Sequence, residues 1–219
     1  DMAAERYAAL FNDPMDAVGR EQKKTCLERA AAVICISQAT RDDLERIYPV
    51  AAPIVRVVPL SHSSAFRVLP VKQARLLKQN ERPYLLYVGS RLHYKNFIAL
   101  IKDYAVWEKR SGVDLVVVGP PWSRAENESL SALGISRQVS LHSDIDDDEL
   151  SRLYNRAAAL VFTSMVEGFG LPLLEAMACG CPIVASRIPS TLEVAEDCPF
   201  YFDLEDQGSL LSAMDQALL

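Results

Sequence analysis

The fold is decided by residues 84–119, which read YLLYVGSRLHYKNFIALIKDYAVWEKRSGVDLVVVG. Two continuous apolar runs, YLLYVG at 84–89 and VDLVVVG at 113–119, flank a segment at 95–110 that has one broadly apolar face. Strands that are apolar at nearly every position are typical of a parallel sheet covered on both faces, and a helix commonly joins two such strands. The stretch therefore predicts a β-α-β unit.

The same alternation continues to the end of the chain. Further strands are predicted at 139–143, 159–164, 181–186 and 200–203, and further helices at 123–133, 146–157, 171–179, 189–197 and 207–219. Six strands that alternate with helices predict a doubly wound, Rossmann-like parallel sheet, which we assign to a domain at 81–219.

Residues 1–80 carry a shorter α-β pattern. Ser37 or Thr40 is expected to cap the helix that follows the run AVICIS, and Pro49 to end it. The expected elements are helical structure in 3–32, strands at 32–37 and 54–60, and a polar linker at 61–82.

The composition is that of a globular protein, with 219 residues, 50% hydrophobic, 24% charged and a net charge of -6. An acidic chain has no overall field that favours nucleic acid. No apolar run approaches the roughly 20 residues that span a bilayer. The chain begins at Asp1 and shows no leader pattern, so we expect a fragment of a cytoplasmic protein.

Cysteines and histidines give no sign of a disulfide framework or a metal site. The five cysteines are odd in number and lack a CxxC pair, which favours buried, reduced thiols. The three histidines are scattered without the spacing of zinc ligands, and His62 is expected to be a solvated loop residue. We expect no metal and no cofactor.

Ligands of doubly wound sheets bind beyond the carboxyl ends of the strands, so four loops are candidates: 89–95, 119–123, 143–146 and 164–171. The first of them contains Gly89, Ser90, Arg91 and Lys95. It is not GxGxxG, which argues against a nicotinamide dinucleotide. A helix start with two cations suits a diphosphate, although the same pattern also fits an ordinary loop with solvated cations.

The stretch EGFGLPLLE at 167–175 offers two interpretations. The first interpretation, an ordinary loop-to-helix junction, explains Pro172 and Glu175, which we place in the first turn of the helix. It does not explain Glu167 or the two glycines, Gly168 and Gly170. Glycines let backbone approach a ligand closely, and carboxylates accept hydrogen bonds from pairs of hydroxyls, so a sugar is the natural partner.

A longer set of motifs resembles the retaining glycosyltransferase family 4, which has the GT-B fold. EGFGLPLLEAMACGCPIVAS is similar to the Glu-x7-Glu region of that family, and YLLYVGSRLHYKN to its phosphate-binding loop. VVVGP, DDDELSRLYNRAAALVFTS and IPSTLEVAED follow in the expected order. AVICISQATRDDLERIYPV resembles the end of the family's N-terminal domain, so 1–80 would be a remnant of that acceptor-side domain.

The resemblance implies roles for individual residues. Glu175 would hold the hydroxyls of the nucleotide ribose, and Glu167 would lie beside those of the donor sugar. Arg91 and Lys95 would neutralise the departing diphosphate. The catalytic residues implied are thus Glu167, Arg91 and Lys95, and the donor-binding set is Gly89, Ser90, Arg91, Lys95, Glu167, Gly168, Phe169, Gly170, Leu171 and Glu175.

The resemblance also implies a hexosyltransferase that moves a sugar, with retention, from a nucleotide-diphosphate sugar to a glycan, lipid-linked or small-molecule acceptor, without an obligatory metal. The run DIDDD at 144–148 contains DxD letters, but it precedes a helix and is interpreted as a cap.

The alternatives are a sugar-nucleotide-binding module without transferase activity and a GT-B-like epimerase. The full enzyme is expected in the cytoplasm, with peripheral association at the inner membrane face and the oligomeric state left open.

Overall fold

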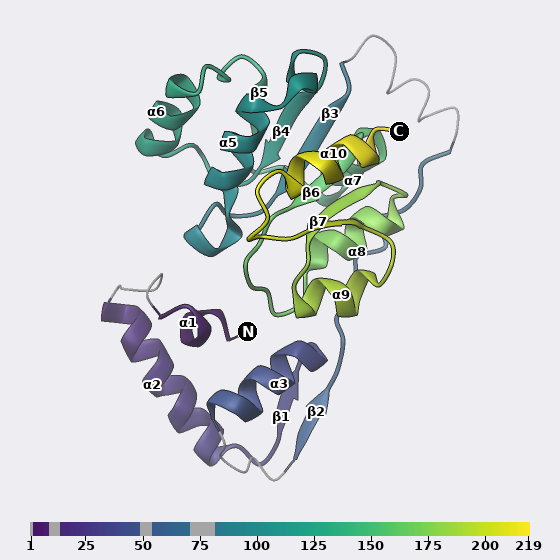
Figure 1. Ribbon diagram of the computed structural model, residues 1–219. Coiled ribbons are helices and arrows are strands. Elements are labelled where there is room, and N and C mark those ends of the chain that lie inside the picture. Colours follow the sequence, from purple (N-terminus) through teal and green to yellow (C-terminus); the bar gives the residue numbers. More distant parts are fainter. Residues whose placement is uncertain (1, 9–13, 49–53, 71–81) are drawn as a thin grey trace.

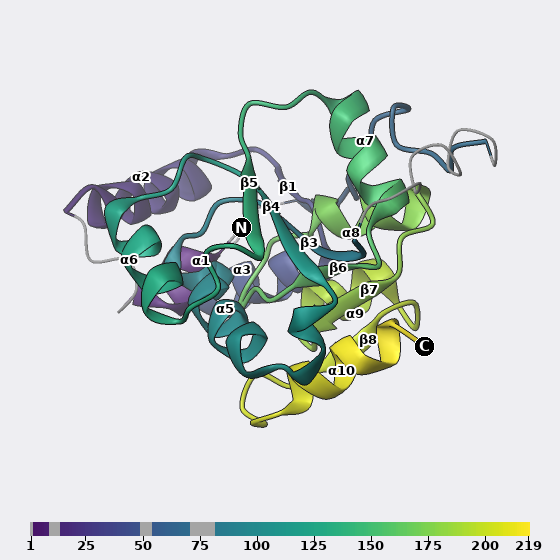
Figure 2. The same cartoon turned by 90° about the horizontal axis from the view of Figure 1, so that it is seen from above.

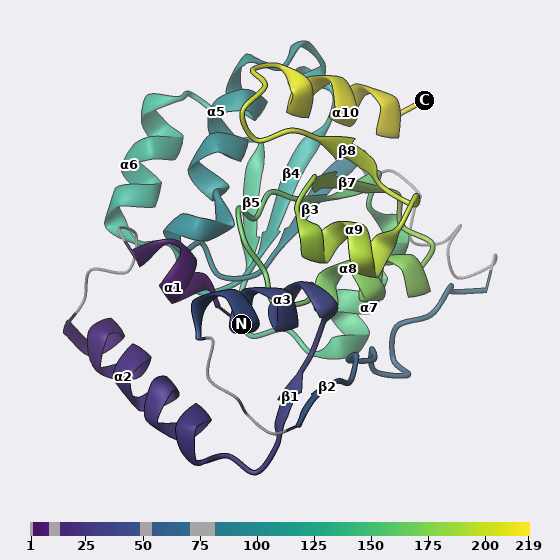
Figure 3. The ribbon, with the colours of Figure 1, turned by 60° about the horizontal axis from the view of Figure 1, so that its bottom comes forward.

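The computed structural model describes residues 2–8, 14–48, 54–70 and 82–219 (Figure 1). A large α/β lobe is formed by 82–219, and a small lobe from the first part of the chain lies against one end of it (Figures 1 and 3). The small lobe contains α1 (Ala3–Arg6), α2 (Pro14–Arg29), β1 (Val33–Cys35), α3 (Gln38–Ile47) and β2 (Val55–Val57). The predicted domain boundary at 80/81 lies outside the described residues.

The large lobe follows the predicted alternation closely. Its elements are β3 (Tyr84–Val88), η2 (His93–Lys95), α5 (Phe97–Val106), η3 (Glu108–Ser111), β4 (Asp114–Val118), α6 (Arg124–Ala132), β5 (Val139–His142), α7 (Asp147–Arg156), β6 (Ala159–Phe162), α8 (Leu171–Ala178), β7 (Ile183–Ser186), α9 (Pro189–Ala195), β8 (Phe200–Phe202) and α10 (Ser209–Ala217).

The six strands β3 to β8 form one sheet in the order β5-β4-β3-β6-β7-β8, and every pair is parallel. The chain builds outward from β3 through β4 to β5, and then returns to the other side of β3 to add β6, β7 and β8. The predicted doubly wound, Rossmann-like sheet is confirmed. Its topological switch point lies between β3 and β6, where a ligand crevice is expected.

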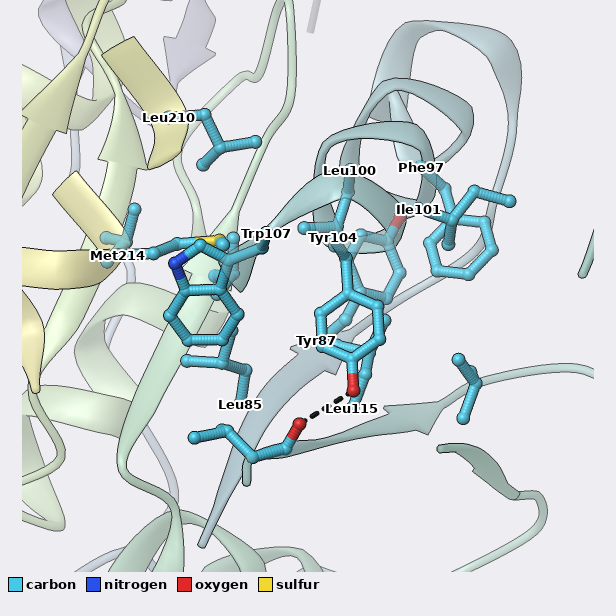
Figure 4. Packing of buried hydrophobic residues seen from close by; sticks show 14 of the residues in the cluster. Leu85, Tyr87, Phe97, Leu100, Ile101, Tyr104, Trp107, Leu115, Leu210 and Met214 are labelled. Carbon is cyan, nitrogen blue, oxygen red and sulfur yellow. Dashed lines mark hydrogen bonds between the residues drawn. The ribbon is translucent and has the colours of Figure 1, made fainter. Parts of the chain in front are cut away.

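Two hydrophobic layers cover the sheet because successive strand side chains point to opposite faces. On one face, Leu85 and Leu115 pack against α5 and α10 (Figure 4). On the other face, Leu86 and Leu160 pack against α7 and α8. Figure 2 shows the sheet between these two helical layers. Strands that are buried on both sides account for the continuous apolar runs in the sequence.

The helix predicted at 95–110 is divided into three pieces. Asn96 adopts the left-handed conformation with φ 58°, between η2 and α5. Trp107 is extended and ends α5 before η3. The expected apolar face, made of Phe97, Ile98, Ile101, Ala105 and Trp107, is only partly right. Ile98 is exposed, whereas Tyr104, which was not part of that face, is fully buried.

In the small lobe, β1 and β2 form a parallel pair with Val33 opposite Val55. Ser37 is the N-cap of α3, since its hydroxyl accepts from the N–H of Thr40 at 2.9 Å. Of the two caps considered, Ser37 is therefore the right one. Pro49, expected to end this helix, lies outside the described residues.

All five cysteines are free thiols. Cys35, Cys179 and Cys181 are buried, as expected, but Cys26 and Cys198 are exposed, so the expectation of buried thiols is wrong for these two. Cys26 lies on the solvent side of α2, and Cys198 in the turn after α9, where neither faces a core layer.

Candidate functional site at the switch point

The loops that follow β3 and β6 lie side by side at the switch point. The hydroxyl of Thr163 donates to the carbonyl of Lys95 at 2.8 Å. The N–H of Met165 donates to the carbonyl of Tyr94 at 2.7 Å. These two bonds join the predicted phosphate-binding loop to the start of the EGFG stretch, because both loops leave neighbouring parallel strands at the same edge.

Lys95 and Glu167 form an ion pair across these loops. The Nζ of Lys95 lies 2.5 Å from Oε1 of Glu167, and the hydroxyl of Ser164 donates to the same oxygen at 2.6 Å. The side chains are 20% and 10% exposed, so the pair is partly shielded from water. The structure thus brings together one predicted cation and one predicted carboxylate.

The EGFG turn depends on the backbone conformation of a glycine. Gly170 has φ 105°, where any other residue would be strained, and a Cβ there would lie in tight contact, 3.0 Å from Cδ1 of Leu173. Phe169 is buried, and Leu171 begins α8 with Pro172 in its first turn. Among the described residues, the N–H groups of Phe169, Gly170 and Leu171 make no hydrogen bond to another backbone group outside regular structure.

Glu175 lies on α8 rather than at its start. Because α8 begins at Leu171 and has no acidic residue in its first turn, the placement of Glu175 in that turn is wrong. The hydroxyl of Tyr154 donates to Oε2 of Glu175 at 2.9 Å. Burial raises the pKa of Glu175 above its ordinary value, and the bond from Tyr154 and the nearby His62 oppose this. A half-buried carboxylate with one free oxygen is well suited to accept hydroxyl donors.

Arg91 is engaged away from this pair. Its guanidinium forms an ion pair with Glu126, donates to the carbonyls of Pro120 and Pro121 at 2.8 and 3.0 Å, and stacks 4.6 Å from the ring centroid of Trp122. The Arg91 side chain is only 4% exposed. The structure therefore does not join Arg91 to Lys95 or Glu167 by any bond within the described residues. Instead, Arg91 links the loop after β3 to the loop after β4 through its bonds to Pro120 and Pro121.

Gly89 and Ser90 lie at the base of the same loop. A Cβ on Gly119 would lie 2.4 Å from the carbonyl oxygen of Gly89, so the loops after β3 and β4 touch through backbone. Gly89 itself has φ 137°, a region that favours glycine. The carbonyl of Ser90 accepts from the hydroxyl of Tyr87 at 2.7 Å.

The acidic run at 144–148 caps α7, as predicted. The carboxylate of Asp146 accepts from the N–H of Glu149 at 2.7 Å. Within the part of the chain that the structure describes, no group of three or more His, Cys, Asp or Glu side chains is arranged to hold a metal. No helix among the described ranges has the length and apolar character to cross a membrane.

Sequence reasoning missed three side chains that form hydrogen bonds or an ion pair with the charged groups of predicted site residues. Ser164 and Tyr154 bond to the two predicted carboxylates, and Glu126 pairs with Arg91. Tyr154 and Glu126 lie on helices distant in sequence from their partners, so no local spacing marks them. Ser164, three residues before Glu167, could have been noticed as a polar residue at a strand end.

Comparison with known proteins now identifies the family. A family model described as "Glycosyl transferases group 1" matches residues 70–219. The chain belongs to this glycosyltransferase family. Its sheet, with the paired loops at the switch point, is the Rossmann-like C-terminal half of the GT-B fold, as the structural neighbours show.

Curated relatives of this glycosyltransferase include two bacterial mannosyltransferases. The chain is 28% identical over 191 residues to the O-antigen chain mannosyltransferase RfbU of Salmonella typhimurium, covering 87% of this chain and 52% of the relative. It is 29% identical over 241 residues to the O-antigen chain mannosyltransferase B of Escherichia coli, covering 98% and 61%. The chain thus spans about half the length of these relatives.

Solved structures give the same fold. A sucrose-phosphate synthase from Thermosynechococcus elongatus is 26% identical with a TM-score of 0.74, over 90% of this chain and 51% of that one. WaaG, a glycosyltransferase involved in lipopolysaccharide biosynthesis, is 20% identical with a TM-score of 0.75, over 84% and 53%. Anabaena HepE, solved in complex with UDP and glucose, is 20% identical with a TM-score of 0.71, over 90% and 60%.

Proposed function

We propose that this glycosyltransferase chain is the donor-binding half of a retaining, family 4 enzyme, with the donor domain at 81–219 and an acceptor-side remnant at 1–80. The donor would be a nucleotide-diphosphate hexose. The O-antigen relatives are mannosyltransferases, which favours mannose as the sugar and a glycan or lipid-linked acceptor. The observation that carries the proposal is the pairing of Lys95 with Glu167 at the switch point.

Lys95 is the better placed of the two predicted cations. When the bond between the sugar C1 and the diphosphate oxygen breaks, negative charge develops on the leaving diphosphate. A preplaced ammonium stabilises that charge in the transition state, so no metal is required for this role. Arg91 is held by Glu126, so a contact with the diphosphate would require its guanidinium to exchange partners.

The two carboxylates would grip hydroxyls rather than act as an acid–base pair. Glu167 shares one oxygen, Oε1, with Lys95 and Ser164, which leaves Oε2 to accept from the donor sugar. Glu175 shares Oε2 with Tyr154, which leaves Oε1 to accept from the ribose. In the transfer, the acceptor oxygen bonds to C1 on the face that the diphosphate leaves, and its proton passes to the departing phosphate oxygen.

A screen of nucleoside diphosphates by thermal unfolding tests this proposal. A ligand that binds only the folded chain raises the free energy of unfolding, by about 2.7 kcal/mol at one hundred times its dissociation constant. We expect ADP, GDP or UDP to stabilise the chain and the corresponding monophosphates to do so less. Absence of stabilisation by every diphosphate would contradict the proposal.

Transfer itself is expected to be weak or absent in this chain, because it spans about half of its relatives. Robust sugar transfer by the 219-residue chain would contradict that expectation. If diphosphates bind but an extended chain still neither transfers sugar nor hydrolyses the donor, the binding-module alternative is favoured. Interconversion of nucleotide sugars would favour the epimerase.

A further inference from the structure

The small lobe contacts the loop at 164–171, which we call the donor loop, through side-chain hydroxyls. That of Tyr7 donates to the carbonyl of Met165 at 3.3 Å, and two others reach the carbonyl of Gly168. Ser37 donates to the carbonyl of Gly168 at 2.5 Å, and Thr40 donates to the same oxygen at 3.0 Å. Ser37 is fully buried, so this is an interior contact between the lobes. Ser37 also caps α3 by accepting from the N–H of Thr40, and its hydroxyl lies 3.0 Å from the hydroxyl of Thr40.

A second contact joins α3 to α9. Both carboxylate oxygens of Glu193 accept backbone N–H groups at the start of α3, from Gln38 at 2.6 Å and from Ala39 at 2.9 Å. Figure 3 shows α3 lying alongside α9. The first N–H groups of a helix lack partners within the helix and favour negative charge. Glu193 of the large lobe therefore accepts hydrogen bonds from two N–H groups that have no acceptor within α3 itself.

The bonds to Gly168 set the direction of the next N–H. A trans peptide is planar, so the carbonyl of Gly168 and the N–H of Phe169 point in opposite directions. Two hydroxyls occupy both lone pairs of this carbonyl from the side of the small lobe. The N–H of Phe169 consequently points away from the two hydroxyls of the small lobe.

We propose that Ser37, Thr40, Gly168 and Glu193 form a lobe clasp that orients the Phe169 N–H toward the sugar of the donor. Ser37 and Thr40 are positioning residues, since they act through the Gly168 peptide. The inference rests on the proposed function and adds to it a coupling between lobes. Because such coupling is reciprocal, donor binding and docking of the small lobe strengthen one another.

Substitutions at Thr40 test the clasp with little change of volume. Thr40→Val removes the hydroxyl that donates to Gly168 and leaves the Ser37 cap in place. Thr40→Ser keeps the hydroxyl and is the rescue variant. Thr25→Val is the matched control, because the one hydrogen bond of the Thr25 hydroxyl within the described residues goes to the carbonyl of Glu21 in the same helix, α2.

Binding of GDP-mannose and of GDP is measured by titration calorimetry, with UDP-glucose and UDP as a second pair. We expect Thr40→Val to weaken nucleotide-sugar binding about three- to tenfold, the effect of losing one hydrogen bond, and to change diphosphate binding less. Thr40→Ser and Thr25→Val should bind as the unaltered chain does. An equal loss for both ligands, or no loss, would overturn the proposal.

A second readout needs no ligand. The amide resonance of Phe169 should shift, and its hydrogen exchange should change, in Thr40→Val but not in Thr40→Ser. Glu193→Gln should speed exchange at Gln38 and Ala39, while Glu45→Gln on the exposed side of α3 should not. If no nucleotide binds the unaltered chain, the proposed function fails. The amide measurements at Phe169, Gln38 and Ala39 then test the lobe clasp without a ligand. An unchanged Phe169 amide in Thr40→Val would overturn it.

Discussion

The Nζ of Lys95 lies 2.5 Å from Oε1 of Glu167, although 72 positions separate them in the chain. They meet because β3 and β6 are neighbours in the sheet and their loops leave the same edge. The pair holds the ammonium at the switch point, where the proposed donor would bind. A cation that is already positioned needs little rearrangement when leaving-group charge develops.

Replacing Lys95 by Met should weaken diphosphate binding. Loss of a charged contact to phosphate costs about 1.5–3 kcal/mol, or roughly 10- to 150-fold in affinity. Nucleoside monophosphates should lose less, because their phosphate lies farther from the leaving position. Lys102→Met, an exposed lysine on α5, is the control. Calorimetric titration with both ligands checks the result, and an equal loss for mono- and diphosphate would contradict the role.

Replacing Glu175 by Gln should separate binding from stability. The variant loses a charged acceptor for the ribose hydroxyls, so nucleotide affinity should fall by about 10- to 150-fold. The raised pKa of Glu175 means that the folded chain disfavours its charge, so removing the charge should not lower the midpoint of thermal unfolding at neutral pH. Glu205→Gln, in an exposed loop, is the control. A large loss of stability together with normal binding would refute both assignments.

Nucleotide binding should depend on the ionisation of Glu175. Burial raises its pKa above the ordinary 4.5, and the hydroxyl of Tyr154 counteracts that rise. As pH falls through this raised pKa, the carboxylate is protonated and binding weakens, at a higher pH than for an exposed glutamate. Tyr154→Phe removes the opposing bond, so the midpoint of the loss should move to higher pH.

Affinity for GDP or UDP measured between about pH 4 and 7 follows this titration. The Glu175→Gln variant reports the titration of the ligand phosphate alone and is subtracted. A midpoint that moves to lower pH in Tyr154→Phe, or does not move, would contradict the assignment.

The pair formed by Arg91 and Glu126 should support stability. Glu126→Gln leaves a nearly buried guanidinium without its charged partner, at a cost of about 1–3 kcal/mol in the free energy of unfolding. Urea unfolding measures this. Glu128→Gln, an exposed pair on the same helix, should cost less than about 1 kcal/mol. Equal effects of the two variants would contradict the structural role.

The same pair predicts a loss of stability in acid. Burial raises the pKa of Glu126, but the bonds from Arg91 and Ser123 outweigh this, and the pKa is lowered. A carboxylate with a lowered folded pKa contributes stability above its unfolded value, and the contribution is lost as pH falls through the folded pKa. The difference in unfolding free energy between the unaltered chain and Glu126→Gln should therefore shrink below about pH 4.

Most of the fold could be predicted because its signals are local. Continuous apolar runs and helical periodicity depend on a few neighbouring residues, and they located all six strands of the large sheet. The helix at 95–110 was predicted without its breaks, since nothing in its apolar pattern required Asn96 to be left-handed or Trp107 to be extended. The start of α8 at Leu171 was predicted correctly, and the error at Glu175 was to count the fifth residue of this helix into its first turn.

The sequence by itself determined the alternation of strands and helices, the loops at the carboxyl ends and the residue types in them. Only the tertiary structure decided the partners: Lys95 with Glu167, Arg91 with Glu126, and Thr40 with Gly168. The physical reason is that side-chain pairing depends on where distant segments return in the sheet order. Arg91 and Lys95 are close in sequence and equally cationic. Nevertheless, Arg91 pairs with Glu126 on α6, whereas Lys95 pairs with Glu167 in the loop after β6.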